Sequence, residues 1–345
     1  MTAHLVHAGS DGFTPEPGLQ VGVPLGFVPE TPSGVTTGSS GESRGTNTPR
    51  SSSSPGGRAE AVRGGRRRRI SSRTLHRLGE EMSERDGLVL ARLWEPRYLT
   101  TRQLQRFCFT GHATDESAAR TTRRVVARLH RARLIRPLAR RVGGVRAGSD
   151  ARVWQLAPAG ARIARPETGR SWRTHEPSER FLAHTLAVAD VHLALRDGQA
   201  HGYEVDVQVE PLSWRRFSGL GGESRLVRPD LTTTVHGHDE HGSYEDRWFV
   251  EVDMGTESLP TLLTKCRLYM DYYRSGSEQA SHGSFPQVLW TMHGPRAKQR
   301  ADALQQRVLR TPSLEPRLFR IVTTDHLDHA LWGDPTTNPE RKEAT

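Results

Sequence analysis

The sequence predicts an α/β protein in which a disordered tail precedes a basic helical module and an acidic module of mixed helices and strands. Three observations predict this division. Glycine, proline and serine dominate the first seventy or so residues, apolar residues then recur at helical spacing, and alternating strand patterns follow from about residue 203. The net charge divides in the same way: +4 over residues 1–74, +11 over residues 75–165 and −5 over residues 166–345.

The tail, residues 1–74, lacks a periodic apolar pattern and contains the stretch TTGSSGESRGTNTPRSSSSPGG. A segment of this composition buries too little apolar surface to offset the entropy that it loses on ordering. We therefore predict that residues 1–74 are disordered, as are residues 333–345. The run of four arginines at 66–69 would either add phosphate contacts or stay solvated without a partner.

Composition and cysteine count exclude several classes of protein. No stretch approaches the ~18 uninterrupted apolar residues of a membrane-spanning helix. The first residues, MTAHLVHAGSDGFTPEPG, lack the basic and apolar regions of a secretory signal. Cys108 and Cys266 are too few and too far apart for a disulfide scaffold or a zinc cluster. We expect a cytoplasmic protein without a membrane partner.

The basic module, residues 75–165, has the element order of a winged helix-turn-helix. The predicted elements are one or two helical segments within 75–93 broken near Gly87, a short helix over 101–107 opened by a threonine cap, a helix over 117–133, and strands over 134–138 and 152–156. A Gly- and Arg-rich loop joins the two strands and would form the wing. The third helix of such a module fits the major groove of DNA, with the wing beside it.

Arginines concentrate on the outward face of the third predicted helix and in the wing. Ala118, Val125 and Leu129 are predicted to point inward, which leaves the arginines on the solvent face. Arginine contacts phosphates and pairs with guanine through two hydrogen bonds. We therefore predict double-stranded DNA as the partner, contacted by Arg120, Arg123, Arg124 and Arg128 of the helix and Arg140, Arg141 and Arg146 of the wing. The alternative is a protein-binding winged helix with a charged solvated face.

A linker, residues 166–177, leads to the acidic module, residues 178–332. The predicted elements are a helix over 178–197 with Ser178 as its cap, strands over 203–209, 226–235 and 247–253, a helix over 258–274, a strand over 286–293, a helix over 296–310 and a strand over 317–323. The order is α-β-β-β-α-β followed by a further helix and strand, which predicts a mixed-sheet α/β domain.

Three carboxylates are expected to meet in the acidic module. Glu251 and Asp253 point to one face of their strand, and Asp230 lies on the preceding strand. If the two strands pair, the three side chains converge, and clustered carboxylates repel one another unless a proton or a cation intervenes. Oxygen ligands of this kind suit Mg²⁺ or Mn²⁺. Asp230, Glu251 and Asp253 are therefore the predicted metal ligands.

Two more residues belong to this candidate site. Glu257 follows at the turn into the next helix, and Lys265 lies on that helix. The chain has 46 arginines and only 3 lysines, so Lys265 marks a position where arginine does not serve. A lysine there can reach a phosphate. The alternative is a solvated strand end at which Lys265 forms a structural ion pair with Glu257 or Asp253.

At these residues the chain resembles known proteins. Pro229-Asp230 on one strand and Glu251-Val252-Asp253 on the next resemble the PD-(D/E)XK nuclease fold. More narrowly, the Arg-rich winged helix with Asp253-Met-Gly-Thr-Glu257, Lys265 and Tyr269 resembles the replication-relaxation family, over about residues 75 to 325. This resemblance implies a part in plasmid or mobile-element replication and DNA relaxation, with replication or mobilisation proteins as partners.

The nuclease pattern usually places lysine two residues after the acid, where this chain has Asp253. The resemblance then implies that Lys265 supplies the cation from the helix, and that Asp230, Glu251, Asp253, Glu257 and Lys265 are the catalytic residues. If Lys265 does not do so, the fold serves as a DNA-binding platform without cleavage.

Two classes of function remain open. One is a DNA-binding replication factor whose acidic module is structural or binds a partner protein. The other is a metal-dependent endonuclease whose winged helix selects the site. A transcriptional regulator is a third reading, against which the large acidic module argues. Nicking of supercoiled plasmid with Mg²⁺, and not with a chelator, separates the first two.

Overall fold

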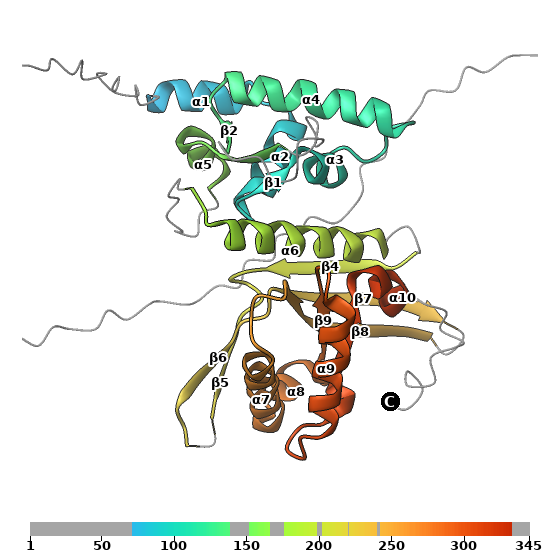
Figure 1. The fold of residues 1–345 in the computed structure, drawn as a ribbon. Coiled ribbons are helices and arrows are strands. Elements are labelled where there is room, and N and C mark those ends of the chain that lie inside the picture. The colour runs from blue at the N-terminus through green and yellow to red at the C-terminus, as the bar shows by residue number, and fades with distance from the viewer. Residues whose placement is uncertain are drawn as a thin grey trace, which may run out of the picture. The chain divides into compact units, whose positions relative to one another are not determined.

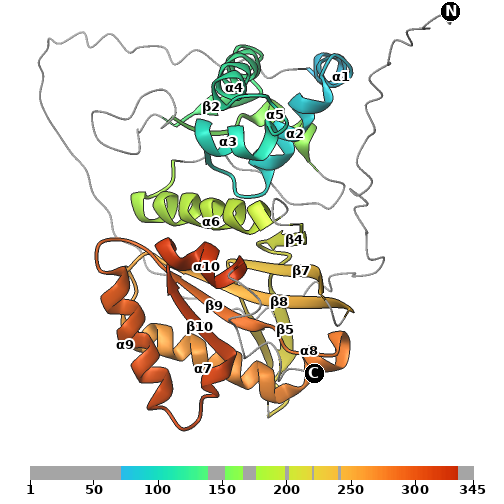
Figure 2. The ribbon, with the colours of Figure 1, turned by 90° about the vertical axis from the view of Figure 1, so that its right-hand side faces the viewer.

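The computed structural model describes residues 71–138, 152–165, 176–198, 202–219, 221–239 and 242–332. All of them fall in one compact unit, which spans Arg66–Thr345. Figures 1 and 2 show the ribbon from two directions. The predicted disorder of residues 1–70 and 333–345 and most of the predicted linker lie outside the described residues. Residues 72–74, assigned to the tail from the sequence, instead begin the first helix.

The first part of the described chain is helical, with a small sheet. Its elements are α1 (Ser72–Glu80), α2 (Glu84–Trp94), β1 (Leu99–Thr100), α3 (Thr101–Cys108), α4 (Asp115–Arg131), β2 (Ile135–Pro137), β3 (Val153–Leu156) and α5 (Pro158–Ala164). The strands form an antiparallel sheet in the order β1-β3-β2. The predicted helices and the two predicted strands are confirmed, whereas β1 and α5 were not foreseen.

The break between the first two helices does not lie near Gly87, as the sequence suggested, but at residues 81–83. Ser83 caps α2: its Oγ accepts a hydrogen bond from Asp86 N, and the Asp86 carboxylate accepts one from Ser83 N. This reciprocal capping box starts the helix at Glu84 and leaves Gly87 inside it. Thr100 and Gln103 form a second capping box that starts α3.

The second part of the described chain is an α/β sandwich. Its elements are α6 (Glu179–Asp197), β4 (Glu204–Val209), β5 (Arg215–Ser218), β6 (Ser224–Val227), β7 (Leu231–Asp239), β8 (Gly242–Asp253), α7 (Leu259–Ser275), α8 (Ser277–His282), β9 (Gln287–Met292), α9 (Ala297–Leu309), β10 (Phe319–Thr323) and α10 (Leu327–Trp332), with 3-10 turns at Pro316–Leu318 and Thr324–His326. The predicted α-β-β-β-α-β order with a further helix and strand is confirmed. The hairpin β5–β6 and the helices α8 and α10 are additions to it.

The main sheet has five strands in the order β10-β9-β8-β7-β4. Strands β4, β7 and β8 pair antiparallel, and β8, β9 and β10 pair parallel, so the sheet is mixed. Apolar side chains alternate between its two faces. Val250 and Val252 of β8 pack with α6 and α10, whereas Phe249 packs with α7 and α9. The sheet therefore lies between two layers of helices (Figure 2).

Helix α6 belongs to two cores. Ala187, Val191 and Leu195 pack on the main sheet. Its other side faces the first part of the chain, because Leu182 and Leu186 pack with Tyr98, and Leu193 joins the core of the first helices. Figure 1 shows α6 between the sheet and the first helices. This shared helix joins the basic and acidic modules through apolar contacts on both of its sides.

The predicted strand over 226–235 is two strands. Pro229 and Asp230 interrupt it, and the segment before them folds back on residues 215–218 to form the hairpin β5–β6. Proline lacks the N–H that a ladder needs, which favours a break at this point. Within the described residues, no helix is long and apolar enough to cross a membrane.

Candidate functional site

Asp230 stands where the chain enters β7 and connects three elements. Its Oδ2 accepts a hydrogen bond of 2.7 Å from the backbone N–H of Val252 on β8. Its Oδ1 lies 3.0 Å from Nε2 of His184 on α6. Because Leu231 pairs with Val250, Asp230 stands at the register position opposite Glu251. The predicted pairing of the two strands is thus confirmed, and it brings the first two carboxylates to neighbouring positions.

Glu251 is buried, and both of its carboxylate oxygens have partners. The hydroxyl of Tyr269 donates a 2.7 Å hydrogen bond to Oε1, and Lys265 Nζ lies 3.3 Å from Oε2. Lys265 also lies 3.2 Å from Oε2 of Glu257. Helix α7 presents both Tyr269 and Lys265 to β8, because residues four apart share one face of a helix. Lys265 therefore bridges the two glutamates.

Charge and burial shift the pKa values of Glu251 and Lys265. Burial raises the pKa of Glu251, and the negative charge of Asp230 adds to this, whereas the positive charge of Lys265 lowers it; the net pKa is about 7. Burial lowers the pKa of Lys265, but the charges of Glu251, Glu257 and Asp230 outweigh it and raise the pKa above its usual range. Lys265 is therefore a permanent cation beside a carboxyl that titrates near neutral pH.

His184 is part of the same group of charges. Burial lowers the pKa of His184, but the hydrogen bond to Asp230 and the negative charge of Asp230 outweigh burial and raise it. Nothing in the sequence around residue 184 indicates this pair. The partner of His184 is 46 residues away, so only the fold brings the two together.

Asp253 is paired with a cation of its own. Arg300 on α9 donates a 2.6 Å hydrogen bond from Nε to Asp253 Oδ2, and Gly255 N donates to Oδ1 at 3.1 Å. Gly255 has φ of 73°, a conformation that glycine adopts without strain. The structure thus brings Asp230, Glu251, Glu257 and Lys265 together and pairs Asp253 with Arg300.

The donor set can be compared with what a metal ion needs. Asp230 and Glu251 supply the carboxylate oxygens that Mg²⁺ or Mn²⁺ prefers. Both oxygens of Asp253 already have partners, Arg300 and Gly255, and both oxygens of Asp230 and of Glu251 are engaged as well. Among the described residues, no three His, Cys, Asp or Glu side chains are arranged to hold a metal ion. A metal ion held by Asp230 and Glu251 would therefore have to share or displace their present partners, and a third ligand from the chain would need a rearrangement.

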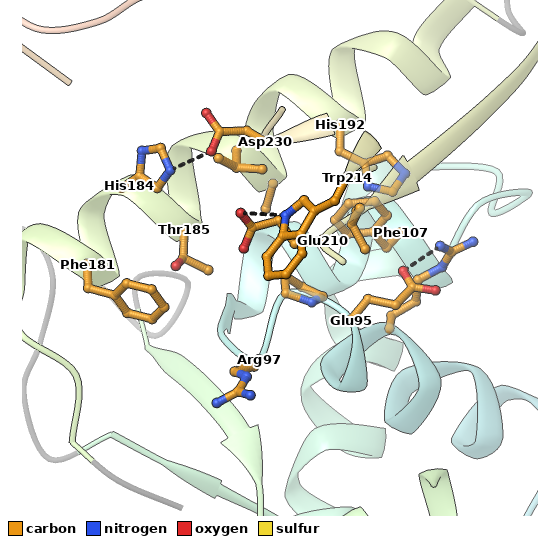
Figure 3. A pocket seen from close by; sticks show the side chains of 15 residues that line it. Glu95, Arg97, Phe107, Phe181, His184, Thr185, His192, Glu210, Trp214 and Asp230 are labelled. Atoms are coloured by element: carbon orange, nitrogen blue, oxygen red, sulfur yellow. Dashed lines mark hydrogen bonds and ion pairs between the residues drawn. The ribbon is translucent and has the colours of Figure 1, made fainter. Parts of the chain in front are cut away.

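A cavity of about 320 Å³ adjoins the pair of His184 and Asp230. Aromatic side chains line it, among them Phe107 of α3, Phe181 of α6 and Trp214 of the segment before β5. Figure 3 shows His184 directed at Asp230, and Trp214 hydrogen-bonded to Glu210. The cavity lies along α6, where the basic and acidic modules meet.

A second candidate surface is the outward face of α4. Ala118, Thr122, Val125, Val126 and Leu129 are the residues of α4 that point into the core. The arginines of this helix, at positions 120, 123, 124, 128 and 131, are all exposed. Arg120 pairs with Glu116, and Arg128 lies 2.6 Å from the buried carboxylate of Asp86 on α2. Arg128 is thus engaged in a contact between helices.

The predicted wing residues Arg140, Arg141 and Arg146 lie outside the described residues. The strands on either side of these residues, β2 and β3, pair antiparallel as expected. Arg300 was also missed by the sequence analysis, because nothing local to residues 297–309 indicates a partner 47 residues away.

Comparison with known proteins gives one match. A family model described as replication-relaxation matches residues 90–288, which is more than half of the chain. The match begins within α2 and ends within β9, so it includes α4 and the hairpin β5–β6. It also includes the residues that the structure brings together, Asp230, Glu251, Glu257 and Lys265. Neither the curated proteins nor the solved structures gave a match.

Proposed function

Because the chain belongs to the replication-relaxation family, we propose that it binds double-stranded DNA in the cytoplasm and acts in plasmid or mobile-element replication and DNA relaxation. The observation that carries this proposal is the row of exposed arginines on α4. Guanidinium groups along one helix face can donate hydrogen bonds to phosphates and to base edges in a groove.

The arrangement around α4 supports a winged helix-turn-helix. Helix α3 precedes α4 across a short turn, and the antiparallel strands β2 and β3 follow it. In such a module the second helix of the pair enters the major groove, and the loop between the strands lies beside it. Arg140, Arg141 and Arg146 belong to that loop in sequence, which would place them against the DNA backbone.

The proposal is tested by comparing the full-length chain with a variant that carries Arg120→Ala, Arg123→Ala and Arg124→Ala. Fluorescence anisotropy with a labelled duplex of about 30 base pairs measures the affinity. We expect the variant to bind at least ten-fold more weakly, because each lost phosphate contact weakens binding. A control with Arg307→Ala and Arg310→Ala removes exposed arginines at the C-terminal end of α9 instead. Equal affinity of all three proteins would show that α4 is not the contact surface.

A second candidate function is metal-dependent DNA cleavage, favoured by the group of Asp230, Glu251 and Lys265. Asp230 and Glu251 would hold Mg²⁺ or Mn²⁺, an ion that activates water and neutralises charge on a phosphate. Lys265 would act as a compact point charge on the phosphate, a task for which ammonium differs from guanidinium. Asp253 would join as a ligand only on release from Arg300.

Nicking of supercoiled plasmid tests this second candidate. Asp230→Asn should abolish nicking in Mg²⁺ and remove any Mg²⁺-dependent rise in melting temperature, while leaving DNA binding unchanged. Asp302→Asn, an exposed carboxylate on α9, is the matched control. If the wild-type chain neither nicks DNA nor gains stability with Mg²⁺ or Mn²⁺, the carboxylates of Asp230 and Glu251 are structural, and DNA binding is the only function of the two that remains.

A further inference from the structure

The hairpin β5–β6 has two faces of different character. Arg215 pairs with Val227 and Phe217 with Arg225 across the two strands. Phe217 and Val227 are buried against α7 in the core of the α/β sandwich. Because side chains alternate along a strand, the residues between them form the opposite face. Figure 1 shows the hairpin beside α7, leading away from the main sheet.

The face that carries Phe217 and Val227 is the inner face of the hairpin. Its two arginines are neutralised by carboxylates. Arg225 Nη1 lies within 2.5 Å of Asp271 Oδ2 on α7. Arg215 lies 3.8 Å from the buried carboxylate of Glu278. These two guanidinium groups therefore hold the hairpin to the helices below it and are not available to a partner.

The outer face carries arginines that have no acidic partner. Its residues are Leu212, Trp214, Arg216 and Ser218 on one strand and its approach, and Ser224, Leu226 and Arg228 on the other. None of them is a carboxylate. Among the described residues, neither Arg216 nor Arg228 has an ion pair, and Arg228 stacks over the ring of Trp214 at 4.9 Å. Both arginines are exposed.

The net charge of the hairpin segment is opposite in sign to that of the module to which it belongs. Residues 166–345 carry a net charge of −5, yet residues 211–228 contain four arginines and one glutamate. Exposed guanidinium and hydroxyl groups along one face of a ribbon match the phosphate oxygens of nucleic acid. A two-stranded ribbon is also one of the elements that the major groove admits.

The hairpin β5–β6 begins and ends close to Asp230. Its two ends are tied together where Ser213 Oγ donates a 2.7 Å hydrogen bond to the carbonyl of Pro229, one residue before Asp230. Trp214 lines the same cavity as His184 and Asp230. A polyanion lying along the outer face would therefore pass beside these residues.

We propose that the outer face of β5–β6, through Arg216 and Arg228, is a second contact surface for the phosphate backbone of double-stranded DNA, separate from α4. The inference rests on the proposed DNA binding and adds to it a site in the acidic module. The contact does not depend on base sequence, because it consists of guanidinium and hydroxyl groups against phosphates.

The salt dependence of binding tests the inference in the full-length chain. Removing two phosphate contacts with Arg216→Ala and Arg228→Ala should reduce the slope of log affinity against log KCl by about 1.8. The reduction should be the same for two duplexes of unrelated sequence. The control Arg307→Ala with Arg310→Ala makes the same change in net charge at the C-terminal end of α9 and should leave the slope unchanged.

Photo-crosslinking locates the contact independently. Cys108 and Cys266 are buried, so a photoreactive label attaches selectively to a new cysteine at an exposed serine. Ser218→Cys on the hairpin should crosslink to labelled duplex several-fold more than Ser313→Cys, which is exposed beyond α9.

The outcomes separate this inference from the proposed function. A wild-type chain that does not bind duplex DNA overturns both. If α4 variants weaken binding while the hairpin variant keeps the wild-type slope and Ser218→Cys crosslinks no more than Ser313→Cys, only the hairpin contact is overturned. A reduced slope together with selective crosslinking from residue 218 supports it.

Discussion

Arg300 on α9 holds Asp253 at the end of β8. The guanidinium Nε donates a 2.6 Å hydrogen bond to Asp253 Oδ2, and Nη2 donates one of 2.9 Å to the carbonyl of Glu257. The Asp253 side chain is 1% exposed and that of Arg300 is 16% exposed. This ion pair fixes the turn between β8 and α7, and with it the positions of Glu257 and the helix that carries Lys265.

Breaking this pair should destabilise the fold. Arg300→Met keeps the aliphatic packing but leaves the Asp253 carboxylate buried without a cation, at a cost of about 3 kcal/mol in the free energy of unfolding. Chemical denaturation measures the change. The double variant Asp253→Asn with Arg300→Met should recover much of the loss, because no uncompensated charge remains. Additive losses in the double variant would show that the two residues do not act as a pair.

Arg128 should behave differently from Arg124, although both lie exposed on α4. The guanidinium of Arg128 holds the buried carboxylate of Asp86, whereas Arg124 has no ion pair among the described residues. Arg128→Ala should lower the free energy of unfolding by about 1 kcal/mol, a value discounted for the exposed half of its side chain. Arg124→Ala should leave stability unchanged and weaken DNA binding. Equal melting temperatures for the two variants would contradict a structural part for Arg128.

Gly160 in α5 should not tolerate a side chain. A Cβ at this position would collide with the backbone carbonyl of Leu134, which cannot move aside without disturbing the approach to β2. Gly160→Ala should therefore lower the melting temperature by several degrees. Gly87 is the matched control, because a Cβ there meets no atom within 4 Å and Gly87 lies inside α2. Gly87→Ala should stabilise the protein by about 0.5–1 kcal/mol.

His192 should make stability depend on pH through the contact between α6 and α3. Its ring packs edge-on against Phe107, with centroids 5.0 Å apart. Burial, together with the positive charges of Arg92 and Arg196, lowers the pKa of His192 to about 3. The unfolded chain takes up this proton below about pH 6.5 and the folded chain does not, so folding loses stability as the pH falls from 6.5 toward 3.

The loss at this one group should reach roughly 3 kcal/mol between pH 7 and pH 4. His192→Phe keeps a ring in place and removes the titration. The difference in unfolding free energy between the variant and the wild type should therefore shift in favour of the variant as the pH is lowered. A difference that stays constant from pH 7 to pH 4 would mean that His192 is protonated in the folded chain.

Local signals predicted most of the helices and strands. Thr100 with Gln103 and Ser178 with the following turn mark helix starts within a few residues, and the alternation over residues 247–253 is that of a strand. The sequence also indicated that Asp230 and Glu251 meet, because consecutive antiparallel strands pair with each other so often.

What the sequence did not show depends on contacts between distant residues. The pairs His184–Asp230 and Asp253–Arg300 join residues 46 and 47 positions apart, and no periodicity marks either arginine or histidine as a partner. The sequence did not predict β5, and part of β6 was predicted as the start of one strand over 226–235 that also contained part of β7. The inner face of the hairpin β5–β6 is stabilised by α7, an element that follows it by more than thirty residues.

The salt dependence of duplex binding by the wild-type chain tests the central claim most directly. Three arginines on α4 and two on the hairpin would each release counterions on contacting phosphates, at about 0.9 in slope for each contact. The affinity of the full-length chain for a duplex of about 30 base pairs, measured at several KCl concentrations, should therefore fall with a log–log slope of about −4 or steeper. A chain that does not bind duplex DNA at low salt, or that binds with a slope near zero, would contradict the account.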